Sequence, residues 1–264
     1  MLCLIFGTDF SDNRYRTIDV NRIHNTHGFV FGETSSERFN IYITDMRTFG
    51  TPARDVSFQS VAGRNGELTL DNKRWSNIEI VYSCAIPTNF ADNFTRFKAS
   101  LLSQTGYQRL TDTGETDVFR LGVVRDAIDP TVIRQGRGGK FDVRFYCKPQ
   151  KFYLYGEYCE KLTEPRTLHN QTGCVALPLI TVYGTGAGNL TIGNTNVEIK
   201  ALADQITIDC DLLNAYRQVG DSAKENKNGD IYAPEFPVLE IGENPVSWDG
   251  EITAVDIVPR WWRL

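Results

Sequence analysis

The sequence holds few side chains whose types and spacing suit metal binding. It has only three histidines, and His24 and His27 form an HxxH pair in a segment with loop or strand character. A zinc site needs three or four ligands, and no third ligand accompanies this pair. His169 lies in a turn rich in Gly, Thr and Asn, where we expect it to face solvent. The sequence therefore predicts no metal site.

Two glycine-rich segments resemble phosphate-binding loops at first sight. Gly184–Asn189 begins like a dinucleotide fingerprint, but its third glycine is displaced and a strand pattern follows it. Gly136–Gly139 also leads into a strand pattern. A phosphate bound by such a loop lies at the N-terminus of a following helix, so neither segment fits a nucleotide. We predict a hairpin loop at the first segment, a flexible turn at the second, and no cofactor.

Arrangements typical of catalysis are equally sparse. The sequence lacks the GxSxG nucleophile elbow, the HExxH zinc motif and the P-loop. Asp209 and Asp211 flank Cys210, and on a strand the two carboxylates would share one face. We interpret this pair as a solvated strand edge. A glycosidase with two carboxylates stays open here, because its chemistry depends on their separation in space. The favoured interpretation is that the protein is not an enzyme.

The six cysteines are scattered and form no CxxC pair, so their spacing supports neither a zinc ribbon nor a thioredoxin-like motif. Most lie beside apolar residues, as small core side chains do. We therefore expect reduced thiols in a protein kept in a cytoplasm. The six are Cys3, Cys84, Cys147, Cys159, Cys174 and Cys210.

Composition narrows the class of protein. The chain has 264 residues and a net charge of −5 at pH 7. No run of Lys and Arg appears, which argues against a dedicated nucleic-acid-binding surface. No stretch approaches the ~20 apolar residues that cross a bilayer, and the N-terminus lacks a signal-peptide pattern. We expect a protein made in a cytoplasm, with two domains and no membrane insertion.

One amphipathic helix is predicted near Asn89–Ser103. Four apolar residues recur there at spacings of four, three and four, which is one face of a 3.6-residue period. Thr88 or Asn89 can cap its start, and Gly106 follows its end. We expect this helix to pack on a sheet through Phe90, Phe94, Phe97 and Leu101.

The rest of the chain has strand periodicity. Apolar and polar residues alternate in short runs separated by Gly, Asn and Asp. Asn65–Gly66 predicts a hairpin with a type I′ turn, and Gly193–Asn194 predicts another tight hairpin. The second half indicates a sandwich or jelly roll built only of strands. The predicted strands are Phe39–Thr44, Leu68–Leu70, Ile78–Tyr82, Val118–Val124, Gly139–Cys147, Leu177–Tyr183, Asn189–Ile192, Val197–Ile199, Gln205–Cys210, Pro237–Ile241 and Val255–Pro259.

Four segments carry a shared pattern, in order along nearly the whole chain. They are VAGRNGEL (Val61–Leu68), FDVRFYCKP (Phe141–Pro149), FPVLEIGENPVSWDG (Phe236–Gly250) and IVPRWWRL (Ile257–Leu264). Together they resemble the distal tail protein family, called Dit, of long-tailed phages that infect Gram-positive bacteria. The first resembles its V-x-G-R-x-G-x-L hairpin, the second a closing strand that ends in C-x-P, the third F-P-x-L-x-x-G-x-N, and the fourth a Pro-Arg-Trp-Trp ending. The sequence departs from the family after Pro149, where an aromatic residue often follows and Gln-Lys-Phe stands here.

This resemblance implies a mainly-β fold with two domains. Residues 1–150 would form a ring-forming β-sandwich with one α-helix and a projecting hairpin. Residues 151–264 would form a galectin-like jelly-roll β-sandwich, and the last residues could fold back on the first domain. Within this frame Arg64 and Asn65, at the hairpin tip, are our candidates for contacts between subunits. Trp261 and Trp262 are candidates for packing or interface aromatics, with packing favoured because exposed Trp is costly.

The resemblance also implies a role and partners. Six copies would form a hexameric ring at the distal end of the tail tube, stacked on the major tail tube protein. The ring would hold the tail-associated hub or lysin protein and, in some phages, receptor-binding or baseplate proteins. DNA would pass through the channel without specific binding. The protein would be synthesised and assembled in the bacterial host cytoplasm and end in the virion tail tip.

Two other classes of function remain open at this point. A carbohydrate-binding module of a tail or adhesion apparatus would use exposed aromatics such as Trp248 in a groove of the jelly roll, but fold alone does not imply that activity. The stretch Tyr155–Asn244 contains no Trp, which weakens this alternative. A tail-associated glycosidase or peptidase is the third class, and the lack of a catalytic constellation argues against it.

Overall fold

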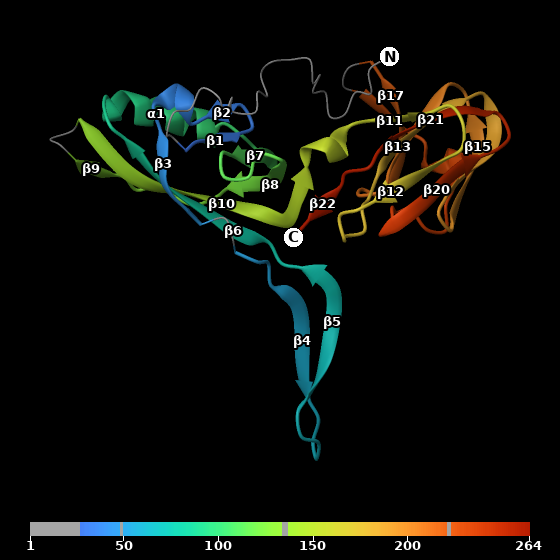
Figure 1. The fold of residues 1–264 in the computed structure, drawn as a ribbon, viewed down its shortest axis with the longest axis horizontal. Coiled ribbons are helices and arrows are strands. Elements are labelled where there is room, and N and C mark those ends of the chain that lie inside the picture. The colour runs from blue at the N-terminus through green and yellow to red at the C-terminus, as the bar shows by residue number, and fades with distance from the viewer. Residues whose placement is uncertain (1–26, 48–49, 134–136, 221–222) are drawn as a thin grey trace. The chain divides into compact units, whose positions relative to one another are not determined.

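The computed structural model describes residues 27–47, 50–133, 137–220 and 223–264. Contacts between residues divide this part of the chain into an N-terminal unit, residues 27–151, and a C-terminal unit, residues 152–263 (Figure 1). The predicted mainly-β class is confirmed, because strands dominate both units and the described residues hold one α-helix. The predicted domain limits and the ring-forming role of the first domain stay predictions.

One sheet forms the body of the N-terminal unit. Its elements are β1 (Phe29–Phe31), β2 (Thr34–Ser35), the 3₁₀ helix η2 (Glu37–Phe39), β3 (Tyr42–Arg47), β6 (Ile78–Ile86), α1 (Phe90–Leu102), β7 (Gln108–Asp112), β8 (Val118–Val124), β9 (Thr131–Ile133) and β10 (Gly138–Tyr153). The strand order is β2-β1-β7-β8-β10-β6-β3, and β9 pairs with the start of β10. β6 and β10 are antiparallel, and their alternating side chains bury Tyr82, Val143 and Phe145. The predicted strand Phe39–Thr44 begins only at Tyr42, because Asn40 is left-handed at φ 55°.

Helix α1 packs on this sheet through its predicted apolar face. Phe90, Phe94, Phe97 and Leu101 are all buried, and the rings of Phe94 and Phe97 contact aromatic residues of the sheet. The Phe94 and Phe141 ring centroids lie 5.0 Å apart. Asn89 occupies the position before the helix with φ 53°, and its side chain makes no capping hydrogen bond. The predicted helix is therefore confirmed, and its face is part of the aromatic core of this unit.

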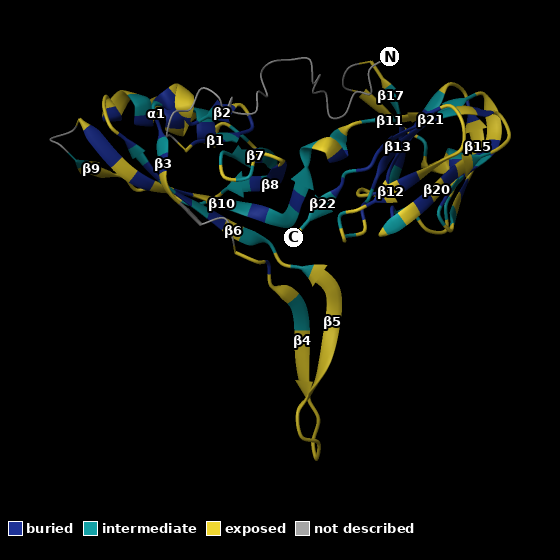
Figure 2. Ribbon diagram, in the orientation of Figure 1, coloured by how far each residue is buried: buried dark blue, intermediate teal, exposed yellow. Residues whose placement is uncertain are grey.

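Two sheets form the C-terminal unit. Its elements are η4 (Leu154–Glu157), β11 (Glu160–Leu162), β12 (Arg166–Asn170), β13 (Leu179–Gly184), β14 (Gly186–Ile192), β15 (Thr195–Leu202), β16 (Gln205–Asp209), β17 (Asn214–Val219), β18 (Ala223–Asn226), η5 (Asn228–Asp230), β19 (Ile231–Tyr232), β20 (Gly242–Trp248), β21 (Ile252–Val258) and β22 (Trp262–Arg263). One sheet has the order β11-β21-β13-β16-β17-β18 and the other β12-β20-β14-β15-β19. Side chains from both sheets share one buried core, and strands of this unit carry buried residues, drawn dark blue in Figure 2. The unit is therefore a β-sandwich.

Two predictions in the C-terminal unit, one of a turn and one of a strand, have opposite outcomes. Gly193–Asn194 is the predicted tight hairpin turn, because Ile192 pairs with Thr195 and Gly193 has φ 57°. Pro237–Ile241 is not a strand: only Leu239 pairs, in an isolated bridge. Pro237 has no N–H to give to a ladder, which explains why pairing is limited to this one residue.

The Gly184–Asn189 segment is not a hairpin loop. β13 and β14 belong to different sheets, so Gly184 and Gly186 carry the chain from one sheet to the other. Gly184 has φ 155°, and a Cβ on it would lie 2.1 Å from the carbonyl oxygen of Glu251. The close approach of two backbones therefore explains this glycine, and the strand that follows leaves no helix N-terminus for a phosphate.

Candidate functional site: the hairpin arm

A two-stranded hairpin extends away from the sheet of the N-terminal unit (Figure 1). Its strands β4 (Arg54–Ser60) and β5 (Glu67–Trp75) pair with each other and, among the described residues, with no further strand. We call residues 54–75 the arm. Both outer edges of the arm carry backbone groups that no strand satisfies, and such edges are where another chain can add strands.

Most of the arm is exposed (Figure 2), and it carries large apolar side chains on both of its faces. Phe58 is 61% exposed and Leu70 is 56% exposed, and Val61 and Leu68 are also exposed. Phe58 lies opposite Thr69, and Leu70 lies opposite Ser57, so Phe58 and Leu70 point to opposite faces. A lone two-stranded hairpin is marginally stable in water, and exposed apolar patches mark interaction sites. The arm is therefore the best candidate for a contact with another chain.

Charged pairs order the base of the arm. Arg54 donates to the Asp71 carboxylate at 2.9 Å from Nε and 2.6 Å from Nη2, and its guanidinium lies 5.2 Å from the Trp75 ring centroid. On the neighbouring register, Arg74 and Asn72 donate to Asp55. These hydrogen bonds lower the pKa of Asp55 and of Asp71, and the hydrogen bond from arginine is the largest cause in each case. Exposed pairs add little stability, so their main effect is to hold β4 and β5 together at the base of the arm.

The predicted contact residues Arg64 and Asn65 lie at the arm's tip. Both are exposed in the loop between Ser60 and Glu67, which are paired. The hairpin is present, but the predicted type I′ turn is wrong, because six residues form the loop. Gly63 and Gly66 take the left-handed conformations, at φ 77° and 80°, and Asn65 is not left-handed. A role for Arg64 and Asn65 between subunits stays a prediction.

The two predicted aromatic residues lie in the C-terminal unit. Trp261 is buried in the sandwich core, and Trp262 is half-buried against it. The Trp261 carbonyl accepts a hydrogen bond from the Tyr153 N–H at 2.9 Å, and the Trp262 Nε1–H donates to the Val175 carbonyl at 2.9 Å. A Cβ on Gly156 would lie 2.5 Å from the Trp261 nitrogen, so this glycine makes room for the terminus. An interface role for either Trp stays a prediction.

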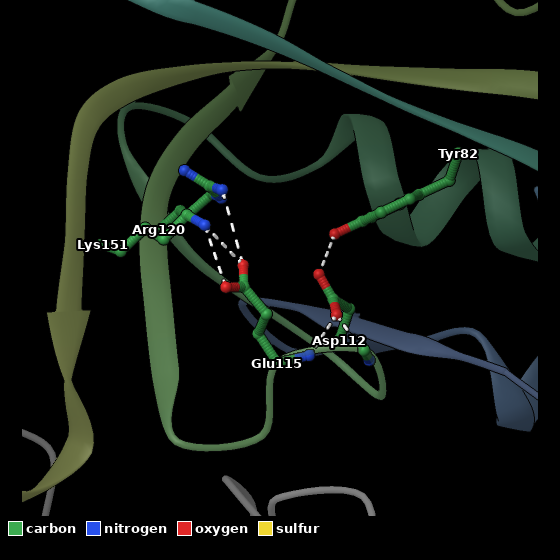
Figure 3. A network of polar contacts seen from close by, with 6 residues as sticks. Tyr82, Asp112, Glu115, Arg120 and Lys151 are labelled. Atoms are coloured by element: carbon green, nitrogen blue, oxygen red, sulfur yellow. Dashed lines mark hydrogen bonds and ion pairs between the residues drawn. The ribbon is translucent and has the colours of Figure 1, made fainter. Parts of the chain in front are cut away.

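A buried polar network lies in the N-terminal unit (Figure 3). The Tyr82 hydroxyl donates to Asp112 at 2.6 Å, and Asp112 also accepts the backbone N–H of Glu115 at 3.1 Å. The Glu115 carboxylate lies 2.8 Å from the Lys151 ammonium and 3.7 Å from the Arg120 guanidinium. Burial, followed by the Asp112 charge, raises the pKa of Tyr82 well above its ordinary value. Tyr82 therefore remains a neutral donor, and the network joins β6, β7, β8 and β10.

The Asp209–Asp211 pair differs from the predicted solvated strand edge. Asp209 is only 1% exposed, and the Arg260 guanidinium donates to both its oxygens, at 2.7 and 3.2 Å. Asp209 also accepts the backbone N–H groups of Asp211 and Leu212. Asp211 is exposed in the turn that follows. The prediction is wrong for Asp209, because the positive charge of Arg260, 51 residues away in sequence, compensates the buried carboxylate.

The histidines, Cys3 and the second glycine-rich segment, whose residue types suit metal or phosphate binding, form no common site among the described residues. His24, Cys3 and Gly136 lie outside the described residues, while Gly138 and Gly139 belong to β10. His27 Nδ1 is 3.2 Å from the Thr113 hydroxyl, and His169 is exposed on β12 rather than in a turn. In the described ranges, no group of three or more His, Cys, Asp or Glu is placed to hold a metal ion.

Three further observations bear on the class of protein. Cys84, Cys147 and Cys210 are buried free thiols, and Cys159 and Cys174 are free and partly exposed. Trp248, the candidate sugar-stacking residue, packs half-buried against the sandwich core. Among the helices that the structure describes, none has the length and apolar character needed to cross a membrane.

Sequence reasoning missed several of these features. The strand β4 was not predicted, although DVSFQS alternates around Val56 and Phe58. That alternation, opposite ELTL across a glycine-flanked loop, is the signal that could have found the first strand of the arm. The Glu115 network and the Asp209–Arg260 pair join distant segments and leave no local pattern.

Three solved structures share the fold of this chain. The Dit protein of phage SPP1, described as a paradigm of the hub adsorption apparatus in Gram-positive infecting phages, has a TM-score of 0.65 and 10% identity, over 88% of this chain and 98% of that chain. A chain of the activated phage P2 baseplate with calcium has a TM-score of 0.51 and 8% identity, over 90% and 98%. A chain of the same baseplate with strontium has a TM-score of 0.51 and 9% identity, over 88% and 97%. No protein-family model and no curated protein matches the sequence.

These likenesses define the class of fold. The chain has the two-unit, mainly-β fold of phage hub and baseplate proteins. In particular, it has the fold of a Dit protein, which confirms at the level of fold the resemblance that the four sequence segments indicated.

Proposed function

We propose that this protein is a structural component of a siphophage tail tip and acts as a distal tail protein. The observation that carries the proposal is the likeness to SPP1 Dit, which extends over 98% of that chain at a TM-score of 0.65. The four sequence segments support it independently, because a structural likeness at 10% identity does not depend on matching motifs. The role is structural rather than enzymatic.

In the proposed assembly, six copies form a ring at the distal end of the tail tube. The ring stacks on the major tail tube protein and holds the hub or lysin protein, and receptor-binding or baseplate proteins attach to it where a phage has them. DNA passes through the channel without specific binding. A net charge of −5 is compatible with this passage, because an acidic protein weakly repels phosphates. The protein is located in the virion tail tip after assembly in the host cytoplasm.

The arm is the proposed contact between neighbouring copies. A ring needs a head-to-tail contact in which one surface meets a different surface on the next subunit, because a self-complementary contact stops at two copies. A projecting hairpin with apolar side chains on both faces is suited to such a contact. Burying Phe58 and Leu70 would contribute about 1.5–3 kcal/mol each.

Light scattering after size exclusion, with negative-stain images of the same fractions, tests this proposal. We expect the wild-type chain to reach six or twelve times its 29.8 kDa mass as concentration rises, with annular particles. The double variant Phe58→Ser, Leu70→Ser should remain monomeric over the same concentrations. A second variant, Arg64→Ala with Asn65→Ala, tests the predicted contribution of the tip.

Leu102→Ser is the matched control, because Leu102 is 57% exposed on the same unit but lies outside the arm. It should assemble like wild type, and circular dichroism should show all variants folded. Rings that form equally well with the arm variant would refute the arm contact while leaving the tail-tip role standing. A wild-type chain that stays monomeric even with purified tube and hub proteins would refute the ring itself.

A further inference from the structure

A cavity of about 280 Å³ lies in the C-terminal unit where the chain crosses between its two sheets. The crossings from β13 to β14, from β15 to β16 and from β18 to β19 each contribute to its lining, through Gly186, Ala203 and Asp230. The Gly184 N–H donates to the Asp204 carbonyl at 3.1 Å, which ties the first two crossings together. Ligand sites occur preferentially at such open ends of β architectures, where loops meet over a rigid frame.

The lining of this cavity is positively charged. Lys200 of β15, Arg217 of β17 and Lys227, which precedes η5, line it, against the single carboxylate of Asp230. Glu225 also pairs with Lys227, so the three cations and two carboxylates leave one excess positive charge here, on a chain whose net charge is −5. Because three separate elements supply the cations, their convergence is a property of the fold and not of a local charge run.

The cations differ in what already binds them. The Lys227 ammonium lies 3.0 Å from Glu225 and 3.2 Å from Asp230. The hydrogen bond to Glu225, followed by that to Asp230, raises the pKa of Lys227 and keeps its side chain charged. The Lys200 ammonium lies 5.9 Å from the Tyr232 ring centroid. In the described part of the chain, no carboxylate lies within ion-pair distance of the Arg217 guanidinium. Arg217 and Lys200 are therefore the groups able to bind an anion, and Lys227 is held in place beside them.

We propose that this cavity binds a phosphate monoester carried on a group about the size of a monosaccharide. A phosphate monoester carries about −1.5 to −2 charges at pH 7, which the two cations Arg217 and Lys200 can balance. The planar guanidinium of Arg217 can donate two parallel hydrogen bonds to one phosphate. Gly186, Ala187, Ala201 and Leu202 form the less polar part of the lining, where a sugar ring can lie. The proposal does not depend on ring assembly or on the tail-tip role.

Titration of the full chain by ¹⁵N-resolved NMR at constant ionic strength tests the site. The probes are glucose-6-phosphate, glucuronate, which has one negative charge on a ring of the same size, and neutral glucose. We expect glucose-6-phosphate to shift the amide signals of residues 200–206 and 217 in a saturable way, with weaker shifts for glucuronate and none for glucose. Arg217→Gln and Lys200→Gln should each weaken binding by about tenfold, the scale of one charge-assisted hydrogen bond.

Arg166→Gln is the matched control, because Arg166 is an exposed cation of the same unit that does not line the cavity. It should bind like wild type. Glucose-6-phosphate shifts that do not saturate, or that fall equally in all three variants, would overturn the proposal. Equal or tighter binding of glucuronate would overturn the phosphate assignment, and equal binding of glucose would show that charge has no part in recognition.

Discussion

At the scale of single residues, buried charges and thiols set the chemistry of the molecule. Asp209 accepts two backbone N–H groups of the turn after β16 and pairs with Arg260, whose backbone is left-handed at φ 56°. Each of the two charges depends on the other, since a buried charge is tolerated only while its partner is present. The pair therefore ties the C-terminal segment of the chain to the six-stranded sheet.

Removing one partner of this pair should destabilise the C-terminal unit strongly. We expect Arg260→Leu to lower the free energy of unfolding by about 3–5 kcal/mol, because Asp209 would remain buried without its counter-ion. Urea unfolding followed by Trp fluorescence measures this, since three of the four Trp lie in this unit. The exposed Arg166→Leu is the control, and a loss at Arg260 no larger than the control's would contradict the assignment.

The buried thiols make the free energy of unfolding depend on pH in the alkaline range. Burial raises the pKa of Cys84, Cys147 and Cys210 from 9.0 to about 12. Above pH 9 the unfolded chain releases thiol protons that the native chain keeps, so the free energy of unfolding falls as pH rises toward 12. The slope is about 1.4 kcal/mol per pH unit for each thiol.

Cys147→Ala should reduce this pH dependence by about 1.4 kcal/mol per unit between pH 9 and 11. The measurement is the free energy of unfolding from urea titrations at several pH values. Val143→Ala removes volume from the same strand and core but carries no thiol, so its slope should equal that of wild type. Equal slopes for all three proteins would show that Cys147 keeps an ordinary pKa in the native state.

At the scale of elements, helix α1 and the arm differ in where their apolar side chains lie. The helix buries its whole aromatic face in the sheet, and Phe97 contacts the rings of Phe29 and Phe39, with centroids 6.3 and 5.8 Å away. The arm buries almost none of its apolar side chains within its own unit. The helix therefore stabilises the fold, whereas the arm is available to a partner.

Truncating the helix face should affect stability and leave the arm's role untouched. We expect Phe97→Ala to lower the free energy of unfolding by about 3–5 kcal/mol, because Phe97 is fully buried and leaves a cavity. Lys98→Ala, on the exposed face, should change it by less than about 0.5 kcal/mol. Thermal and urea unfolding check both values. A small effect of Phe97→Ala would mean that the core collapses around the missing ring.

At the scale of the whole molecule, each unit has a hydrophobic core of its own. The core of the C-terminal unit includes Trp261, so this unit needs the end of the chain. We expect a fragment of residues 152–264 to fold alone, giving a dispersed NMR spectrum and one cooperative thermal transition. A truncation at residue 258, which removes both terminal Trp, should abolish that transition. A fragment that is unfolded at its full length would show that the C-terminal unit depends on the rest of the chain.

Much of this fold could be predicted from local patterns. The aromatic residues of α1 give a clear helical period, and the strand Val118–Val124 has the same bounds as predicted. The crossing between sheets at Gly184–Asn189 could not be predicted, since nothing local shows that the next strand joins another sheet. The Asp209–Arg260 pair and the cavity around Arg217 arise from segments distant in sequence. Residue patterns report a strand's own faces, and they do not report which strands become neighbours.

The arm's exposure also has an evolutionary consequence. No arm residue belongs to either buried core, so substitutions there escape the selection that keeps a core packed. If the arm makes the proposed contact between copies, its sequence is free to change together with the surface that it binds, while the rest of the chain keeps its fold. Compatibility between subunits from different phages would then reside in residues 54–75, and exchanging that one segment would transfer it.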